Sequence, residues 1–233
     1  MKASDQQKKG IADQLAVAGV DVGAHKKLCN LVILRGTEVV ASISQIAPED
    51  LPALCIEHGV QVVGVDAPCI WRKGSAARQA ERDMARAGVS SFSTPTEEQG
   101  QSSRFYDWMF FGMRVYAALA ATHPRLQAAR YTSGSVCFET FPHAITCALL
   151  GADVASAALK STQRKALLEA LGIDTTKLKS VDARDAALCA LTAQFLLRGK
   201  TRTYGDAVGG FIHVPEVTPD DAVAIIAKMG KFA

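Results

Sequence analysis

The sequence of 233 residues lacks several features that would assign a function class at once. No two of its six cysteines are spaced as Cys-x-x-Cys, so the common zinc-binding pattern is absent. The first ten residues are polar and basic, without the apolar core of a signal peptide. The net charge of +3 is small, so the molecule as a whole is not a polybasic nucleic-acid binder, and any anion-binding surface must be local.

One apolar stretch, residues 105–121, is long enough to be considered as a membrane span. Asp107 and Arg114 lie inside it, and each would be costly in lipid. Hydrophobic residues make up 48% of the chain and charged residues 21%, as in ordinary globular proteins. We therefore expect a cytoplasmic protein with no membrane partner.

The length fits one large domain, or one domain with an insertion. We expect a flexible N-terminal arm over residues 1–15 and a single domain over residues 16–233. Residues 72–133 break the alternation of strands and helices and predict a helical insertion. No internal repeat or low-complexity tract is present.

The order of apolar segments predicts an α/β fold. Three β-prone segments open the chain, and a turn signal at Arg35-Gly36 indicates that they form an antiparallel meander. Two later strands are separated by helices, so they should run parallel to the first. The result is a mixed five-stranded sheet flanked by helices. The expected strands are residues 16–22, 27–34, 37–44, 61–66 and 135–139; the expected helices are 48–58, 75–87, 104–123, 142–150, 161–171, 182–198 and 219–228, with a loop over 90–103 and an irregular hairpin over 201–215.

Four acidic motifs follow one another along these elements. Burying an unpaired carboxylate is costly, so acids at the ends of apolar strands need a reason. The carboxyl ends of parallel strands meet at one edge of an open α/β sheet, where ligands gather. The acids therefore predict a shared cation site. The motifs are Gly19-Val20-Asp21-Val22-Gly23, Gly64-Val65-Asp66-Ala67-Pro68, Phe138-Glu139-Thr140-Phe141-Pro142 and Asp182-Ala183-Arg184-Asp185-Ala186.

This arrangement resembles the ribonuclease H-like fold, and the chain is similar to the DUF429 family of predicted ribonuclease H-like nucleases. The similarity covers roughly residues 16–215 and includes residues 78–83 and 204–215 besides the acidic motifs. The order and spacing of the motifs are more specific than any one of them. The pair Asp182 and Asp185 also resembles the final-helix acids of Holliday-junction resolvases in the same superfamily.

Two positions depart from the family pattern. His143 stands where the family often has a second acid after the Glu-x-x-Pro motif. Val22 stands where the family often has glycine after its first Asp. Neither change removes one of the four core carboxylates, but His143 bears on metal affinity and substrate choice.

The resemblance implies a metal-dependent phosphodiester hydrolase that uses Mg²⁺ or Mn²⁺. Two such ions about 4 Å apart can activate a water and stabilise the leaving oxygen. Asp21 would bridge both ions from the central strand, and Asp66 and Glu139 would flank it. Asp185, or Asp182, would close the site from the last long helix, where Asp185 shares a face with the apolar residues. The predicted catalytic residues are Asp21, Asp66, Glu139 and Asp185, and Asp182 is a further metal ligand.

Each acid also has a purely structural interpretation. Asp21 and Asp66 could be turn acids at strand ends. Glu139 could pair with an arginine. Asp182 could be the N-cap of its helix, with Asp185 at the third helical position.

Several basic residues are candidates for substrate binding. Arg78 and Arg82 lie on one predicted helix and could hold a phosphate, or they could form a solvated face. Lys160 belongs to a basic cluster with Arg164 and Lys165 that has the same two interpretations. His143 is a candidate for a supporting role behind the metal ligands.

Two other function classes stay open. Actin-like phosphoryl-transfer enzymes and ATPases share this core, and Asp21-Val22-Gly23 matches their Asp-x-Gly phosphate loop. Their second glycine-bearing Asp motif is not supplied by Asp66-Ala67-Pro68, and the chain has room for only one such domain. The other class is a non-catalytic nucleic-acid- or protein-binding scaffold. The expected partner is nucleic acid or a phosphorylated small molecule, and the sequence indicates no oligomeric state.

Overall fold

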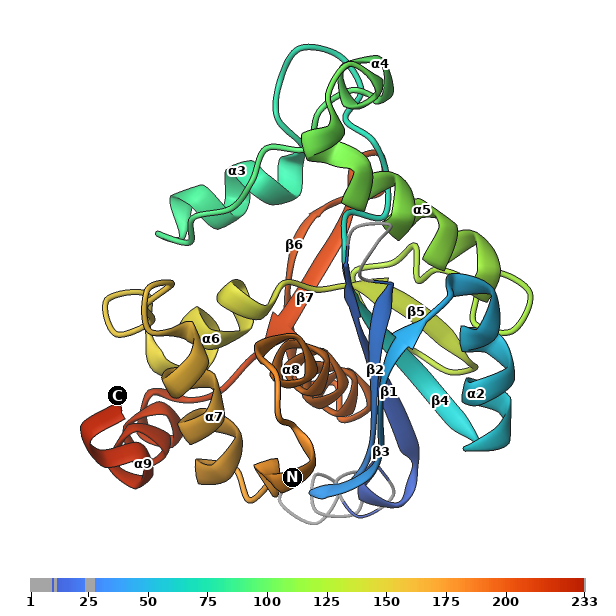
Figure 1. The fold of residues 1–233 in the computed structure, drawn as a ribbon. Coiled ribbons are helices and arrows are strands. Elements are labelled where there is room, and N and C mark those ends of the chain that lie inside the picture. The colour runs from blue at the N-terminus through green and yellow to red at the C-terminus, as the bar shows by residue number, and fades with distance from the viewer. Residues whose placement is uncertain (1–9, 11, 24–27, 233) are drawn as a thin grey trace.

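The computed structural model describes residues 10, 12–23 and 28–232. Most of the predicted N-terminal arm and the beginning of the second predicted strand lie outside these residues. The described chain forms one seven-stranded sheet in the order β3-β2-β1-β4-β5-β7-β6, with helices on both faces (Figure 1). The strands are β1 Ala16–Val22, β2 Cys29–Arg35, β3 Glu38–Ile46, β4 Val60–Asp66, β5 Val136–Glu139, β6 Thr201–Asp206 and β7 Gly210–Pro215.

The central strands pair as the sequence predicts. β1 is antiparallel to β2, and β2 is antiparallel to β3, which confirms the meander. β4 runs parallel to β1, and β5 runs parallel to β4. β1 and β4 are buried on both faces, which explains their nearly continuous apolar sequence.

The prediction of five strands is wrong because the segment over residues 201–215 is a regular hairpin that joins the sheet. β6 pairs with β7 in antiparallel register, and β7 pairs parallel with β5 through Glu139 and Ile212. Gly205 and Gly210, which made the segment resemble an irregular loop, adopt positive φ angles of 107° and 82°. Apolar side chains of β7 bury themselves beneath the helices, so tertiary packing makes these residues a strand.

Helices cover the sheet in two layers (Figure 1). α2 and α5 pack on one face, against a core that includes Ala18, Ile33 and Val63. α6, α7, α8 and α9 cover the other face, against alternate residues such as Val17 and Val62. The bounds are α2 Leu51–Glu57, α5 Asp107–Leu119, α6 Pro142–Leu150, α7 Lys160–Ala170, α8 Val181–Leu197 and α9 Pro219–Met229.

The segment predicted as an insertion contains two further helices, α3 Gln79–Arg86 and α4 Glu97–Gln101, beyond one end of the sheet (Figure 1). The prediction of a loop over residues 90–103 missed α4. A capping box of Thr96 and Gln99 closes the first turn of this short helix. The helix expected from residue 104 begins as the 3₁₀ turn Arg104–Tyr106 and continues as α5.

Shorter 3₁₀ turns complete the chain at Pro48–Asp50, Thr175–Lys177 and Gly230–Phe232. Within the described ranges, no helix is both long and apolar enough to cross a membrane. The apolar stretch over residues 105–121 is instead largely α5, which packs on the sheet.

Candidate metal centre

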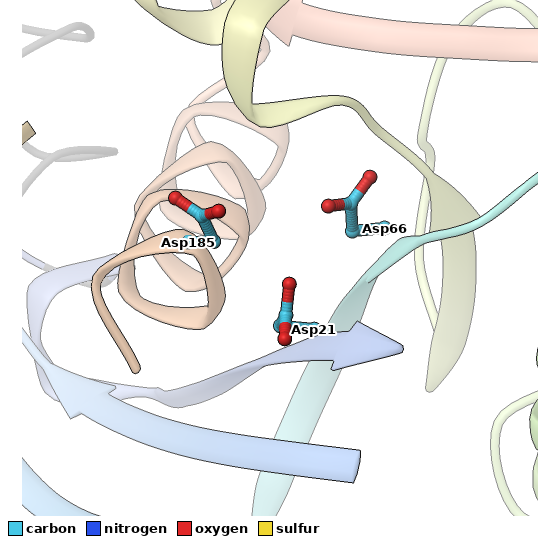
Figure 2. Close-up of side chains that lie close together, drawn as sticks. All are labelled: Asp21, Asp66 and Asp185. Carbon is cyan, nitrogen blue, oxygen red and sulfur yellow. The ribbon is translucent and has the colours of Figure 1, made fainter. Parts of the chain in front are cut away.

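Three of the predicted acids converge where β1 and β4 end. Asp21 and Asp66 are paired in the register of the two parallel strands, and Asp185 comes from α8. One carboxylate oxygen of each residue lies within 4.8 Å of the oxygens of the other two. Figure 2 shows the three carboxylates pointing toward one another from two strands and a helix.

The glycines of the first two motifs allow this convergence. Gly19 and Asp21 point to the same face of β1, and Gly64 and Asp66 do so on β4, because side chains alternate along a strand. A Cβ atom on Gly19 would lie 1.9 Å from the carbonyl oxygen of Ala186, and one on Gly64 would lie 2.5 Å from that of Cys189. The backbone of α8 therefore sits directly on both glycines, which holds the helix that carries Asp185 close to both strands.

The electrostatics of the three acids are unusual. Burial, followed by the charges of Asp185 and Asp182, raises the pKa of Asp21 to about 7. Burial also raises the pKa of Asp66 well above its ordinary value, and the charges of Asp21 and Asp185 add to the effect. The pKa of Asp185 is raised to about 6 by burial, although Arg164 opposes the shift. The fold thus brings together more negative charge than it neutralises.

Two neighbouring side chains stabilise the acids in part. Asn30 on β2 lies opposite Asp21, and its Nδ2 donates a hydrogen bond to Asp21 Oδ2 at 3.4 Å. Arg164 on α7 donates from Nη1 to Asp185 Oδ1, and both side chains are buried. One arginine cannot balance three carboxylates, so the cluster favours an added cation.

The donor chemistry fits a hard divalent cation. Mg²⁺ and Mn²⁺ prefer carboxylate oxygen, and Mg²⁺ lies about 2.1 Å from its ligands. In octahedral geometry, oxygens bound to such an ion are about 3.0 Å apart when adjacent and about 4.2 Å apart when opposite. The oxygens of Asp21, Asp66 and Asp185 lie within 4.8 Å of one another, so small side-chain movements would bring them to one ion.

Glu139, the fourth predicted acid, does not belong to this group of three. Arg78 binds its carboxylate with both terminal nitrogens, at 2.9 Å from Oε1 and 2.7 Å from Oε2. The backbone N–H of Cys69 donates a third hydrogen bond to Oε2, at 2.9 Å. Glu139 therefore forms an ion pair with an arginine, as its purely structural interpretation predicts.

Arg78, which the sequence analysis gives as a candidate for phosphate binding, is thus bonded to a protein carboxylate. Its Nε donates to the carbonyl oxygen of Gly209 at 2.8 Å, and Nη1 lies 3.4 Å from Thr94 Oγ1. Arg78 is buried. It ties the insertion to β5 and to the β6–β7 turn, so its donors are directed at protein groups.

Asp182 lies one turn before Asp185 and is half-buried. The N-cap of α8 is Ser180, whose hydroxyl accepts from the N–H of Ala183 at 2.9 Å, so the N-cap alternative for Asp182 is wrong. The charge of Asp182 contributes to the raised pKa of Asp21, so this residue acts on the site without being one of its three converging carboxylates.

The predicted basic residues take different places. Lys160 is exposed at the start of α7, and its charge lowers the pKa of Asp185. His143 on α6 is half-buried, and burial followed by the charge of Arg164 lowers its pKa. Arg82 is exposed on α3, where it donates to Gln79.

A small cavity of about 60 Å³ adjoins the cluster. Its walls come from the ends of β4 and β5, from the insertion and from β7. Asp66 and Glu139 line it together with Glu81 and Phe92. The other lining residues are Ala67, Pro68, Met84, Ser91, Thr94, Trp108, Thr140, Phe141 and Ile212.

Sequence reasoning did not single out Asn30 or the inward role of Arg164. Asn30 is a lone polar residue in the apolar run of β2, and that exception was a usable signal. Arg164 precedes Leu167 and Leu168 at helical spacing, which places it on the buried face of α7. The composition of the basic cluster does not distinguish buried Arg164 from exposed Lys160 and Lys165.

Comparison with known proteins identifies the family. The sequence model of the family described as "Protein of unknown function (DUF429)" matches residues 15–208, and the chain belongs to this family. Neither the curated proteins nor the solved structures give a match to the chain.

Proposed function

We propose that this protein is a metal-dependent phosphodiester hydrolase of ribonuclease H-like type, acting as a nuclease. The observation that carries the proposal is the convergence of Asp21, Asp66 and Asp185, whose carboxylates have raised pKa values and, among the described residues, one arginine partner. Such a charge excess lowers stability unless a cation relieves it, so its presence favours a functional site over an inert scaffold.

The chain's own residues would divide the work as follows. Asp21, Asp66 and Asp185 would hold Mg²⁺ or Mn²⁺ with their carboxylate oxygens. Bound divalent ions lower the pKa of coordinated water and stabilise charge on phosphate oxygens. Arg164 orients Asp185, and exposed Lys160 beside it offers a positive charge to a phosphate group.

Glu139 and Arg78 have a positioning role in this proposal. Their ion pair fixes the chain after β4 through the Cys69 N–H and fixes the β6–β7 turn through Gly209. The segment after β4 lines the cavity beside Asp66 through Ala67 and Pro68, and β7 lines it through Ile212. A nucleic acid or a phosphorylated small molecule that reaches the three aspartates would contact this wall.

Calorimetric titration with Mn²⁺, together with a cleavage assay on mixed single- and double-stranded DNA and RNA, tests the proposal. Wild type should bind Mn²⁺ and cleave, and Asp21→Asn and Asp185→Asn should lose both. Asp182→Asn is the matched control on the same helix, and it should retain binding with a modest loss of affinity.

The possible results separate the alternatives. Binding without cleavage of any nucleic acid would keep the metal centre and direct the search to small phosphorylated substrates. A folded wild type that binds no Mn²⁺ at millimolar concentration would refute the proposal. Equal losses in Asp182→Asn and Asp185→Asn would contradict the three-ligand assignment.

A further inference from the structure

Glu81, which lines the cavity beside Asp66, has a buried carboxylate oxygen with no hydrogen-bond partner among the described residues. Glu81 lies on α3 and is 6% exposed. Its Oε1 accepts a hydrogen bond from the N–H of Thr94 at 2.9 Å. Its Oε2 is buried and has no hydrogen-bond partner among the described residues. A buried acceptor of this kind is costly unless a donor reaches it, and none comes from the described part of the chain.

A cluster of aromatic rings stands at the same cavity, and its member Phe92 is exposed. Phe92 and Trp108 line it, and their ring centroids are 6.5 Å apart. Phe105 lies beside Phe92 at 6.0 Å, and both phenylalanines are more than half exposed. Exposed apolar rings next to a polar pocket provide a surface on which a flat heterocycle can stack.

A positively charged side chain lies next to this cavity. Arg82 is adjacent to Glu81 on α3 and is exposed. It lines a second, larger hollow of about 450 Å³, whose walls also include Glu81 and Phe92. Acceptor, rings and arginine therefore occupy one continuous surface that starts at Asp66.

We propose that this surface is a nucleobase subsite in which Glu81 accepts a hydrogen bond from the exocyclic amino group of a base, so that between the pyrimidines it takes cytosine. A carboxylate only accepts hydrogen bonds, so it selects a base edge that carries a donor. Uracil and thymine carry a carbonyl oxygen at the position of that amino group, and two acceptors repel one another. The cavity of about 60 Å³ has room for the edge of a base, while the ring stacks on Phe92 outside it.

The inference rests on the proposed function in that the base belongs to the polynucleotide cleaved at the three aspartates. Its test is binding, which does not require cleavage. Fluorescein-labelled ten-residue oligocytidylate and oligouridylate would be titrated with Asp185→Asn protein at low salt, and anisotropy would be recorded. Asp185→Asn prevents cleavage and reduces the repulsion of phosphate at the site.

The cytosine oligomer should bind roughly tenfold more tightly than the uracil oligomer. Adding Glu81→Gln should reduce this ratio to within about twofold, because an amide offers both a donor and an acceptor. The glutamine can still accept from the N–H of Thr94, so the fold should persist. Phe92→Ser should weaken both oligomers by a similar factor of roughly ten, because stacking tolerates any base.

The subsite would be overturned if Asp185→Asn protein that retains Glu81 bound the two oligomers equally or bound neither of them. Wild-type cleavage with no difference between cytosine and uracil sites would overturn it as well, while leaving the nuclease proposal intact. A cytosine preference that depends on Glu81, in a protein that cleaves nothing with Mn²⁺, would uphold the subsite and refute the nuclease. The two proposals therefore fail independently.

Discussion

Gly19 of β1 lies directly beneath the backbone of Ala186 on α8. A Cβ atom on the glycine would approach the carbonyl oxygen of Ala186 to 1.9 Å and the backbone nitrogen of Ala190 to 2.3 Å. Both are main-chain atoms, which cannot rotate away as a flexible side chain can. Gly19 lies two residues before Asp21, and Ala186 directly follows Asp185. The contact between Gly19 and Ala186 thus sets the distance between the two acids.

Gly19→Ala should therefore damage both stability and metal binding. The methyl group would push α8 from the sheet and cost on the order of 3 kcal/mol or more. It would also move Asp185 away from Asp21. Urea unfolding would measure the first effect and Mn²⁺ calorimetry the second. Gly10→Ala is the control, because a Cβ atom there meets no atom within 4 Å. Unchanged Mn²⁺ affinity in a folded Gly19→Ala protein would show that the close approach does not position the site.

Asp21→Asn should alter how stability depends on pH. The pKa of Asp21 is about 7 in the fold, against 3.8 without the fold. The folded state therefore binds more protons between these values, and the free energy of unfolding falls as the pH rises through this range. The variant should show a smaller fall and should be more stable than wild type above pH 7 in EDTA. Urea unfolding at pH 5, 6, 7 and 8 would measure this, and parallel profiles would contradict it.

Glu139 and Arg78 should behave as a coupled pair. Each of Arg78→Met and Glu139→Gln removes the partner of a buried group and should cost about 3–5 kcal/mol. The double variant should cost clearly less than the sum, because neither group is then left without its partner. Urea unfolding of the four proteins gives the coupling energy.

The same variants test what Glu139 does at the site. As a positioning residue, Glu139→Gln should lose less Mn²⁺ affinity than Asp185→Asn. Glu139 would instead be a metal ligand if Glu139→Gln lost as much Mn²⁺ affinity as Asp185→Asn and if the stability losses of Arg78→Met and Glu139→Gln were additive in the double variant.

His213 should make the protein sensitive to acid. It is a fully buried residue of β7 whose ring packs against Phe138 of β5, and burial lowers its pKa from 6.5 to about 4. The unfolded state therefore binds more protons between these values, and stability falls as the pH drops from about 6.5 to about 4. The loss should be on the order of 3 kcal/mol. His213→Asn should lack this part of the pH dependence, as measured by urea unfolding at pH 4, 5 and 6.5 in EDTA. A variant with the wild-type slope would refute this origin.

The sequence predicted the parts of the fold that periodicity controls. The meander, the parallel β4 and β5, and the helix that carries Asp185 follow from apolar patterns and turn residues. The β6–β7 hairpin was missed as part of the sheet because Gly205 and Gly210 suggest a loop, and only burial under α3 and α6 makes it a strand. α4 was missed because five polar residues carry no apolar periodicity.

For the site, the motifs predicted a shared cluster of Asp21, Asp66, Glu139 and Asp185, of which three converge and Glu139 instead pairs with Arg78. Asp21, Asp66 and Asp185 converge as expected, since strand ends and one helix face fix them. The bond between Glu139 and Arg78 joins residues 61 positions apart. No local pattern indicates that contact. Glu81 is similar, because the lack of a partner at its Oε2 is a property of the packed surroundings.

Close contact between α8 and the two strand glycines has a consequence for which ion fits. Widening the space between the strand acids and Asp185 would lift α8 from Gly19 and Gly64 and lose this close packing. Mg²⁺ takes ligands at about 2.1 Å and Ca²⁺ at about 2.3–2.6 Å, with more of them. Contacts between backbone atoms adjust less easily than contacts between flexible side chains. We therefore expect Asp21, Asp66 and Asp185 to bind Mg²⁺ in preference to the larger Ca²⁺.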